Sequence, residues 1–349
     1  MGKQHETYIV FSCQPESKEL CLNEILSTSN EIKFDRWLSP GVGIIRCSAT
    51  FAEFSAMCSQ RTLIYLQHIF PAEYNINWDS QEPLNDILNN LTTRMQKDET
   101  FSVQMRKASA PSAEAQRIKS AIQTHIEAKG FQLQVSRPCT VISMFCTAER
   151  IILGLSRATQ NLSNWPGGMR KYAFRPETIS RAEFKLLEAI EHFALQLPQH
   201  GLAVDLGAAP GGWTRILLEN GMHVIAVDPA SLSPTLNAHP NLTHFKGLAQ
   251  NFIKNNNEPI DVLVNDMKMD VQESAKIMNL MAPYVKCGGL AIVTFKLPHS
   301  KKTAIVNKGL SLLSKNYSVL HVKQLFNNRS EITVVARKRE AALRTRGFA

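Results

Sequence analysis

The sequence predicts an α/β protein whose C-terminal half is a doubly wound parallel sheet with an antiparallel last strand. From about residue 176, apolar strand-like runs alternate with helical segments, as in parallel sheets covered on both faces. The last two runs, SVLHVKQLF and EITVVARK, are separated only by the turn NNRS. So short a link makes a hairpin, so the last strand must run antiparallel to its neighbour.

The elements of this half follow in a regular order. A helix is expected over 180–197, before the first strand. The expected strands that follow cover 202–207, 223–228, 242–246, 261–266 and 289–296. The expected helices lie near 212–220, 272–285 and 301–314. The terminal hairpin completes the sheet.

Two polar seams, PAEYNINWDSQEP (71–83) and QNLSNWPGGMRKYAFRPE (160–177), divide the chain into three expected parts. The first is a small α+β unit with strands at 7–13, 41–49 and 62–70 and helices at 17–27 and 52–60. The second has helices at 82–96 and 113–130, with strand-like runs at 101–109, 135–147 and 150–158. We therefore expect domains over 1–78, 79–165 and 166–349.

Composition narrows the class of protein. The net charge of +9 and the pI of about 9.2 favour a polyanionic partner, with RNA or DNA ahead of a membrane. The seven cysteines form no C-x-x-C pair, which disfavours a disulfide scaffold or a zinc ribbon and suits a reducing cytoplasm. No signal peptide and no membrane-spanning run are recognisable. We expect a cytoplasmic protein without a resident metal.

The stretch VDLGAAPGGW (204–213) links the first strand of the C-terminal sheet to the next helix and is the predicted ligand loop. Ligands of doubly wound sheets bind beyond the carboxyl ends of the strands. Glycines in the loop permit positive φ and close approach. The next strand ends in Asp228, where an acid is placed to bind ribose hydroxyls. These features alone fit a nicotinamide or an adenosyl cofactor.

Asp205 favours S-adenosylmethionine, because its carboxylate would repel a pyrophosphate but suits an ammonium and a sulfonium. The loop also lacks the G-x-G-x-x-G spacing of nicotinamide enzymes. The alternative is a tight structural turn in which Asp205 caps the next helix. The predicted cofactor-binding residues are Asp205, Gly207, Ala208, Ala209, Pro210, Gly211, Gly212, Trp213, Asp228 and Asp266.

Four charged residues are expected at the same edge of the sheet. Asp266 and Lys296 end strands, and Glu331 opens the antiparallel strand, whose amino end lies at that edge. Lys185 lies on the helix before the first strand, which can pass over the edge. Singly, each has an ordinary explanation as a solvated helix residue, a turn residue or a strand-start residue. Together they predict two amines and two carboxylates beside the cofactor.

The segments SRAEFKL, DLGAAPGGW, ND-M, FKLP and RSEITVV occur in the order of the FtsJ/RrmJ-type ribose 2′-O-methyltransferases, which residues 176–338 resemble. The resemblance implies a Rossmann-like class I methyltransferase sheet, S-adenosylmethionine as cofactor, and a Lys-Asp-Lys-Glu catalytic tetrad at Lys185, Asp266, Lys296 and Glu331. One departure is HFKGLAQNF (244–252), which lacks the acid expected near the adenine.

The whole chain is most similar to the large-subunit ribosomal RNA methyltransferase M group, which acts on a cytidine ribose. That similarity implies a ferredoxin-like unit over 1–78, a THUMP RNA-binding domain over 79–165, and the methyltransferase with a basic tail over 166–349. The N-terminal part of the match rests on element order.

The implied reaction is in-line methyl transfer to a ribose hydroxyl, which requires positioning and loss of a proton. Lys296 is the candidate base, oriented by Asp266 and Glu331. Neighbouring carboxylates favour its ammonium form, whereas burial and Lys185 favour its neutral form. A neutral Lys296 would accept the proton, and a charged one would stabilise the developing alkoxide. Both roles stay open.

Basic residues in the second part and at the second seam are candidates for tracking RNA phosphates. They are Arg106, Lys107, Arg117, Lys119, Arg170, Lys171 and Arg175, with Lys301, Lys302 and the basic segment 337–346 extending the set. A solvated basic surface is the alternative explanation.

The leading functional hypothesis is 2′-O-methylation of large-subunit rRNA. Methylation of a tRNA ribose is the nearer alternative, since THUMP domains often occur in tRNA-modifying enzymes. A non-catalytic RNA-binding assembly factor is the alternative of a different class, which an intact tetrad disfavours. An N-methylating enzyme typically has an Asn/Asp-Pro-Pro-aromatic loop, whereas this chain has Asn265-Asp266-Met267-Lys268.

Overall fold

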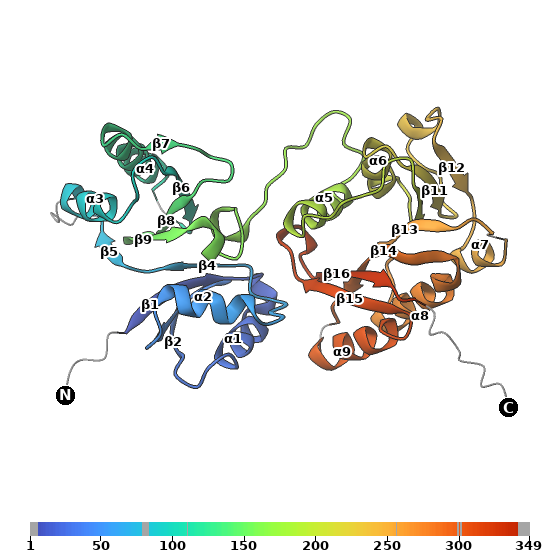
Figure 1. Cartoon of the computed structure of the whole chain (residues 1–349), viewed down its shortest axis with the longest axis horizontal. Coiled ribbons are helices and arrows are strands. Elements are labelled where there is room, and N and C mark those ends of the chain that lie inside the picture. The colour runs from blue at the N-terminus through green and yellow to red at the C-terminus, as the bar shows by residue number, and fades with distance from the viewer. Residues whose placement is uncertain are drawn as a thin grey trace. The chain divides into compact units, whose positions relative to one another are not determined.

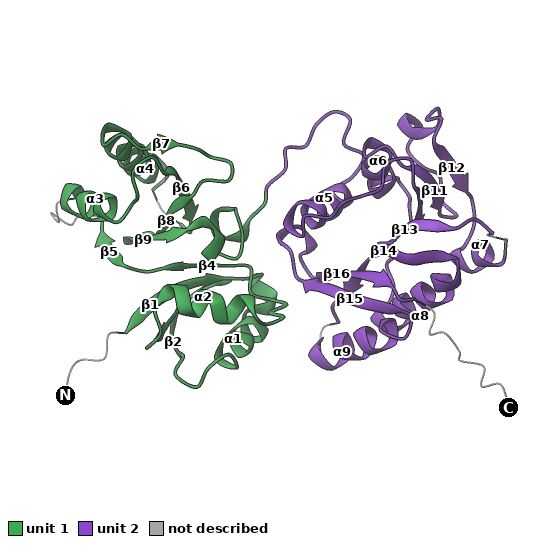
Figure 2. Ribbon diagram, in the orientation of Figure 1, with its two compact units in different colours: residues 1–170 green, residues 171–349 purple. Residues whose placement is uncertain are grey.

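A computed structural model describes residues 6–78, 84–109, 111–255, 257–298, 300 and 302–340. The chain divides into two compact units, residues 1–170 and residues 171–349 (Figures 1 and 2). The division falls after Arg170, later than the expected domain start at 166. The carbonyl of Gly167 accepts hydrogen bonds from Ser12 Oγ at 2.8 Å and from the Arg106 guanidinium at 3.1 Å. Residues 166–170 therefore fold with the first unit.

The first unit begins with a four-stranded antiparallel sheet in the order β2-β3-β1-β4. Its elements are β1 (Thr7–Ser12), α1 (Lys18–Leu26), β2 (Lys33–Ser39), β3 (Val42–Cys47), α2 (Phe51–Ser59) and β4 (His68–Pro71). The sequence did not predict β2, because KFDRWLS is largely polar and its residues stay exposed or half-buried. The expected strand at 62–70 begins only at His68.

The second sheet of this unit has five strands in the order β5-β9-β8-β6-β7. Its elements are β5 (Tyr74–Asn77), α3 (Leu84–Thr93), β6 (Thr100–Lys107), α4 (Ser112–Ala128), β7 (Gln132–Leu133), β8 (Thr140–Cys146) and β9 (Arg150–Arg157). One apolar core joins α3 and α4 to the sheet. Because β5 pairs with β9, the change of sheet falls before Tyr74 rather than near residue 78. The start of the helix expected at 82 lies outside the described residues.

The second unit is built on a seven-stranded sheet in the order β12-β11-β10-β13-β14-β16-β15. The strands are β10 (Leu202–Leu206), β11 (His223–Val227), β12 (Leu242–Phe245), β13 (Ile260–Asn265), β14 (Val285–Lys296), β15 (Tyr317–Lys323) and β16 (Glu331–Lys338). Pairing is parallel from β12 to β14, and β16 runs antiparallel to both β14 and β15. The predicted antiparallel last strand is confirmed.

Helices cover both faces of this sheet (Figure 1). They are α5 (Ala182–His192), α6 (Gly212–Glu219), α7 (Ala249–Asn255), α8 (Val271–Met281) and α9 (Lys302–Leu313). Leu186 of α5 and Ile216 of α6 share a core with Ile292 of β14, whereas Gly309 of α9 lies against Phe295 on the other face of that strand. The sequence did not predict α7, and α5 is shorter than the expected 180–197.

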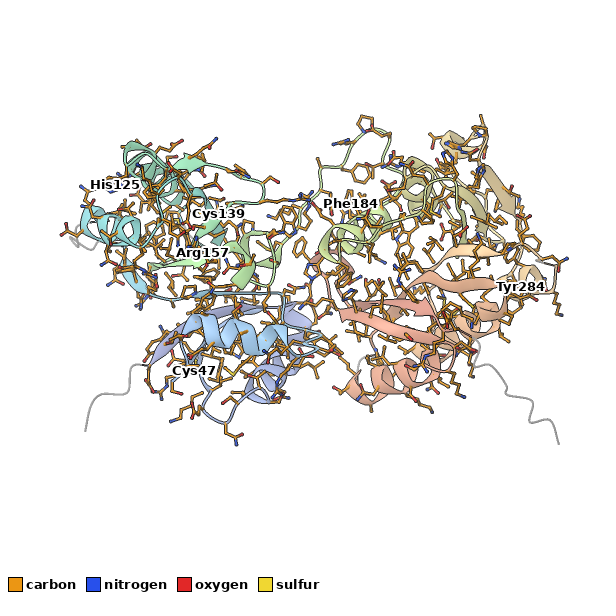
Figure 3. The ribbon with its side chains drawn as sticks, viewed as in Figure 1. Cys47, His125, Cys139, Arg157, Phe184 and Tyr284 are labelled. Carbon is orange, nitrogen blue, oxygen red and sulfur yellow. The ribbon has the colours of Figure 1, made fainter. Side chains whose placement is uncertain are left out.

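All seven cysteines lie within the described residues and carry free thiols; Cys47 and Cys139 are labelled in Figure 3. None of the helices in the described ranges combines the length and the apolar character needed to cross a membrane. The same residues contain no group of three or more His, Cys, Asp or Glu side chains arranged to hold a metal ion.

Candidate active site

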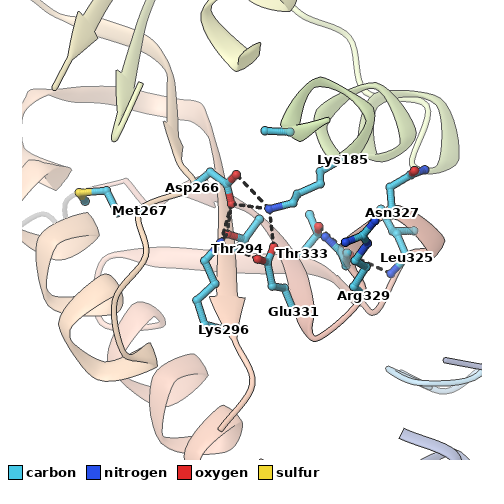
Figure 4. Close-up of polar contacts among 12 residues, drawn as sticks. Lys185, Asp266, Met267, Thr294, Lys296, Leu325, Asn327, Arg329, Glu331 and Thr333 are labelled. Atoms are coloured by element: carbon cyan, nitrogen blue, oxygen red, sulfur yellow. Dashed lines mark hydrogen bonds and ion pairs between the residues drawn. The ribbon is translucent and has the colours of Figure 1, made fainter. Parts of the chain in front are cut away.

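Lys185, Asp266, Lys296 and Glu331 meet at one edge of the seven-stranded sheet (Figure 4). Lys296 Nζ donates to Asp266 Oδ1 and to Glu331 Oε1, each at 2.8 Å. Lys185 Nζ lies 3.1 Å from Asp266 Oδ2 and 2.7 Å from Glu331 Oε2. Each carboxylate therefore bridges both ammonium groups, and the four side chains form one closed cluster.

The sheet topology explains this convergence. Asp266 follows β13 and Lys296 ends β14, so both project from the carboxyl edge of neighbouring parallel strands. Glu331 opens β16 directly opposite Lys296 in the antiparallel register. Lys185 lies on α5, and its side chain reaches the edge from above the strands (Figure 4). The sequence prediction that these four residues converge is what the structure shows.

Thr294 belongs to the cluster and was missed by the sequence analysis. Its buried hydroxyl donates to Asp266 Oδ1 at 2.6 Å and accepts from Lys296 Nζ at 3.1 Å. Residues two apart on a strand face the same side of the sheet. Because Thr294 lies two residues before Lys296 on the same strand, this spacing could have predicted that Thr294 joins the cluster.

The cluster is charged but electrically balanced. Its four side chains are only 12 to 22% exposed. Burial acts to raise the pKa of Asp266, but the ammonium groups of Lys296 and Lys185 outweigh it and hold that pKa below its ordinary value. Burial acts to lower the pKa of Lys185, but Asp266 and Glu331 outweigh it and raise that pKa. Near neutral pH these shifts favour a charged carboxylate at Asp266 and a charged ammonium at Lys185.

The loop after β10 depends on glycine at two positions. Gly207 has φ +77°, and a Cβ there would lie 2.4 Å from Met267 Cγ and 3.1 Å from Met267 Cα. Gly211, at φ +111°, precedes the first residue of α6. A side chain at Gly207 would collide with Met267, so glycine lets this loop pack closely against the segment after β13. The loop therefore lies directly beside the residue that follows Asp266.

The Asp205 side chain lies in the interior of the domain. It is 1% exposed and accepts a hydrogen bond from Thr214 Oγ1 at 2.7 Å. Burial raises its pKa to about 7. The carboxyl therefore joins β10 to α6. The capping alternative considered from the sequence is closer to the observed contact.

The Trp213 side chain is likewise part of the core. It is 3% exposed, and its indole Nε1 donates to the carbonyl of Ala182 at 2.8 Å. This bond ties the start of α6 to the start of α5, the helix that carries Lys185. Trp213, which was predicted among the cofactor-binding residues, therefore directs its side chain into the core of the domain.

Asp228 and Ser180 supply polar groups around the loop. Asp228 follows β11, and its carboxylate accepts from the backbone N–H groups of Ala209 at 3.1 Å and Ala230 at 2.8 Å. Ser180 was missed by the sequence analysis: its buried hydroxyl has no hydrogen-bond partner among the described residues. A Cβ on Gly212 would lie 2.4 Å from that hydroxyl. No local sequence pattern links Ser180 to so distant a loop.

The segment after β12, where an acid was expected near the adenine, offers none. It presents Leu248, which is 55% exposed, immediately before α7. The departure noted in the sequence is therefore a real feature of the site, which presents an apolar side chain at this position.

The predicted RNA-binding residues are in varied environments. Arg106 is partly buried, its guanidinium donates to the carbonyl of Gly167, and burial lowers its pKa. Arg117 pairs with Glu114 on an exposed face of α4. Arg170 stacks over the Trp165 ring at 4.2 Å. Side-chain exposure is high for Lys107, Lys171 and Arg175 and intermediate for Lys119.

The C-terminal basic residues are not grouped with the tetrad. Arg337 and Lys338 end β16, so they lie at the edge of the sheet opposite Glu331. Lys302 begins α9. Arg339 donates to the carbonyl of Tyr317 at 3.1 Å. Lys301 and residues 341–349, which include the end of the expected basic segment, lie outside the described residues.

Comparisons with known proteins bear on this site. Residues 178–333 match the family model of the FtsJ-like methyltransferases. A ribosomal RNA large subunit methyltransferase M from Laribacter hongkongensis is 31% identical over 216 residues, 58% of this chain and 60% of that relative. Another, from Aromatoleum aromaticum, is 28% identical over 84% of this chain and 83% of its own length. A crystal structure of TrmN from Thermus thermophilus covers 96% of this chain and 100% of its own, with 13% identity and a TM-score of 0.38.

Proposed function

We propose that this chain, through its FtsJ-like methyltransferase domain (residues 178–333), methylates a ribose 2′-hydroxyl of large-subunit ribosomal RNA, that of a cytidine, with S-adenosylmethionine as donor. The single observation that carries the proposal is the closed Lys-Asp-Lys-Glu cluster beside the glycine-dependent loop. The names of the two relatives support the rRNA substrate. A cytoplasmic location follows from that substrate in a bacterium.

The residues around the loop fit S-adenosylmethionine, which supplies an activated methyl group when bound. Gly207 and Gly211 have positive φ and let the loop pack closely against Met267 and Leu236. We assign Asp228 to the ribose hydroxyls, the Ser180 hydroxyl to a polar group of the same ligand, and Leu248 to an apolar contact with its adenine. The backbone from Gly207 to Trp213 is assigned to further contacts with the same ligand. Asp205 and Trp213 hold that backbone in place through their buried contacts.

Lys296 is the residue that we assign to the substrate hydroxyl. Its ammonium has three hydrogens and three oxygen partners, of which Thr294 at 3.1 Å is the most distant. The ribose hydroxyl of the substrate would replace Thr294 as the third hydrogen-bond partner of Lys296. As an ammonium, Lys296 orients the hydroxyl and stabilises developing alkoxide. As a neutral amine, it accepts the hydroxyl proton.

Lys185 keeps both carboxylates of the cluster paired with a cation, independently of Lys296. If Lys296 releases its proton, Lys185 still contacts both Asp266 and Glu331. One positive charge then remains between the two carboxylates, so neither is left buried without a cation. Lys185 is therefore a positioning residue whose charge supports the proton chemistry of its neighbour.

The first unit is proposed to bind the RNA substrate. A ferredoxin-like unit is supported by the order β1-α1-β2-β3-α2-β4 and by the strand order β2-β3-β1-β4. The five-stranded sheet that follows is proposed as the THUMP domain. The candidates for phosphate contacts are the predicted basic residues of both units. They are Arg106, Lys107, Arg117, Lys119 and Arg170 on the first unit, and Lys171 and Arg175 on the second.

A map of ribose 2′-O-methylation across cellular RNA tests the proposal. The strains compared would carry the intact gene, no gene, the Lys296→Ala variant, or Lys286→Ala as a matched control. Lys286 is the second residue of the strand that Lys296 ends, and it bonds Asp261 at 2.7 Å, away from the cluster. We expect one rRNA ribose to lose its methyl group without the gene and with Lys296→Ala, but not with Lys286→Ala.

Binding of S-adenosylmethionine to Lys296→Ala, measured by calorimetry, should stay close to that of the wild type. A large loss of cofactor affinity would contradict the role given to Lys296. Loss of a tRNA methyl group instead would move the substrate to tRNA, and no change at any ribose would favour a non-catalytic RNA-binding protein.

A further inference from the structure

The turn between β15 and β16 holds Arg329 in an unfavourable backbone conformation. Its φ and ψ are +54° and −106°, close to the first central position of a type II′ turn, which glycine normally occupies. Side chains other than glycine are strained at positive φ, and such positions persist only where the surroundings impose them. The observed strain thus calls for a reason to keep an arginine there.

Three buried polar side chains impose this conformation. The Gln324 amide donates to the carbonyl of Arg329 at 2.6 Å. Asn328 accepts from a backbone N–H of the turn at 2.8 Å. Glu188, reaching across from α5, accepts from two further backbone N–H groups of the turn at 2.9 and 2.7 Å. The turn is therefore rigidly held rather than merely a connection between two strands.

The Arg329 side chain is exposed on this rigid turn. Its guanidinium makes no hydrogen bond or ion pair with any residue in the part of the chain that the structure describes. Arg329 also lies two residues before Glu331, beside the tetrad (Figure 4). Because the tetrad is balanced by its own two carboxylates, the arginine keeps its charge for another partner.

Strand order places Arg329 on the side of the tetrad away from the cofactor loop. That loop follows β10, and β13 and β14 lie between β10 and β16. At about 4.8 Å per strand, the start of β16 is roughly 14 Å from the end of β10. Asp266 and Lys296 occupy the ends of the intervening strands. An anion bound by Arg329 therefore lies on the substrate side.

We propose that Arg329 binds a backbone phosphate of the RNA strand beside the target ribose; this rests on the proposed function of the same site. A guanidinium offers a planar fork of donors that matches two phosphate oxygens. A rigid turn lowers the entropy lost when that contact forms. A guanidinium held beside Glu331 for this contact explains why the chain has an arginine at a backbone position that favours glycine.

The first test compares Arg329→Gln with Arg337→Gln. Both variants lose one positive charge from an exposed arginine. Arg329 lies in the turn before β16, whereas Arg337 lies near the other end of β16, at the opposite edge of the sheet, and bonds the carbonyl of Gly288. Affinity for a transcript of large-subunit rRNA would be measured over a range of salt concentrations. For Arg329→Gln we expect the slope of log K against log salt to fall by about 0.7 to 1, one phosphate contact. Arg337→Gln should keep the wild-type slope.

The second test uses Arg329→Gly, which separates backbone strain from charge. Relief of the strain should raise Tm by about 2–4 °C. The same variant should lose RNA affinity to the extent that Arg329→Gln does. Arg329→Lys should retain part of the affinity, since it keeps the charge but not the fork.

Equal salt slopes for Arg329→Gln and the wild type would overturn the proposal, as would failure of the wild type to bind the transcript. A loss of S-adenosylmethionine affinity in Arg329→Gln, with RNA binding unchanged, would also overturn it by assigning the anion to the cofactor carboxylate. If the wild type methylates no ribose but its RNA affinity depends on Arg329 as expected, the proposed function fails and the phosphate site stands.

Discussion

Two carboxyl groups on adjacent strands of the second unit respond to burial in opposite ways. Asp205, on β10, has a hydroxyl as its hydrogen-bonding neighbour, and burial raises its pKa to about 7. Asp266, after β13, is flanked by Lys296 and Lys185, and those charges lower its pKa despite burial. The partners of each group therefore decide whether the proton or the charge is kept.

The raised pKa of Asp205 predicts a pH-dependent stability. Below about pH 4 the carboxyl is protonated in both the folded and the unfolded chain, so the folded state pays no charge penalty. As the pH rises to about 7, the unfolded chain binds fewer protons, and the free energy of unfolding falls. Asp205→Asn should remove this loss, becoming more stable than the wild type by up to about 4 kcal/mol at pH 8. Urea unfolding at several pH values measures the difference, and a constant difference between pH 4 and pH 8 would contradict the prediction.

At the scale of elements, Glu188 joins the helix that carries Lys185 to the turn that precedes Glu331. Glu188 is 3% exposed and accepts three hydrogen bonds from Phe326 and Asn327, two from backbone N–H groups and one from the Asn327 amide. One helix and one turn are thereby fixed relative to each other. The geometry between Lys185 and Glu331 depends on this link.

Glu188→Ala should lower the free energy of unfolding by about 2–5 kcal/mol, because two buried backbone donors lose their acceptor. The methyl-transfer rate should fall further than the affinity for S-adenosylmethionine. Glu191→Ala is the matched control: Glu191 is exposed one turn along α5 and accepts from the Tyr172 hydroxyl at 2.8 Å. Denaturant unfolding and single-turnover kinetics provide the readouts. Equal unfolding free energies and equal methyl-transfer rates for Glu188→Ala and Glu191→Ala would refute the role given to Glu188.

At the scale of the molecule, the two units carry different parts of the proposed activity. The tetrad and the cofactor loop lie entirely within residues 171–349. The first unit has its own apolar cores, and Gly167 belongs to it through the bonds to Ser12 and Arg106. Cofactor binding and RNA binding should therefore be separable by truncation.

Removal of residues 1–170 should leave the affinity for S-adenosylmethionine within about threefold of the full chain, because each contact in the site is internal to the second unit. RNA affinity should fall by at least about tenfold, since the phosphate contacts of the first unit are lost. Calorimetry with the cofactor and filter binding with an rRNA transcript test the two halves of the prediction. Unchanged RNA affinity would argue against RNA binding by the first unit.

The sequence by itself determined that the charged site residues on the strands of the second unit lie at one edge of the sheet. Alternation of apolar strands and helices gave the parallel sheet, and the short NNRS link required the antiparallel strand. The carboxyl ends of parallel strands lie at the same edge of a sheet, so Asp266 and Lys296 had to lie close together. Because β16 is antiparallel, its first residue, Glu331, lies at that edge too. These relations depend on direction and period, which local sequence carries.

Only the tertiary structure decided which way the polar groups face and what they contact. Asp205 turned inward to Thr214, Ser180 came to lie against the cofactor loop, and Arg329 was held in a strained conformation by Gln324. Each of these depends on elements that are distant in the chain or on the packing of one side chain against another. The periodicity of the local sequence does not predict such contacts. They form only when the sheet and its helices pack together, because that packing decides which polar groups are buried and which hydrogen bonds they make.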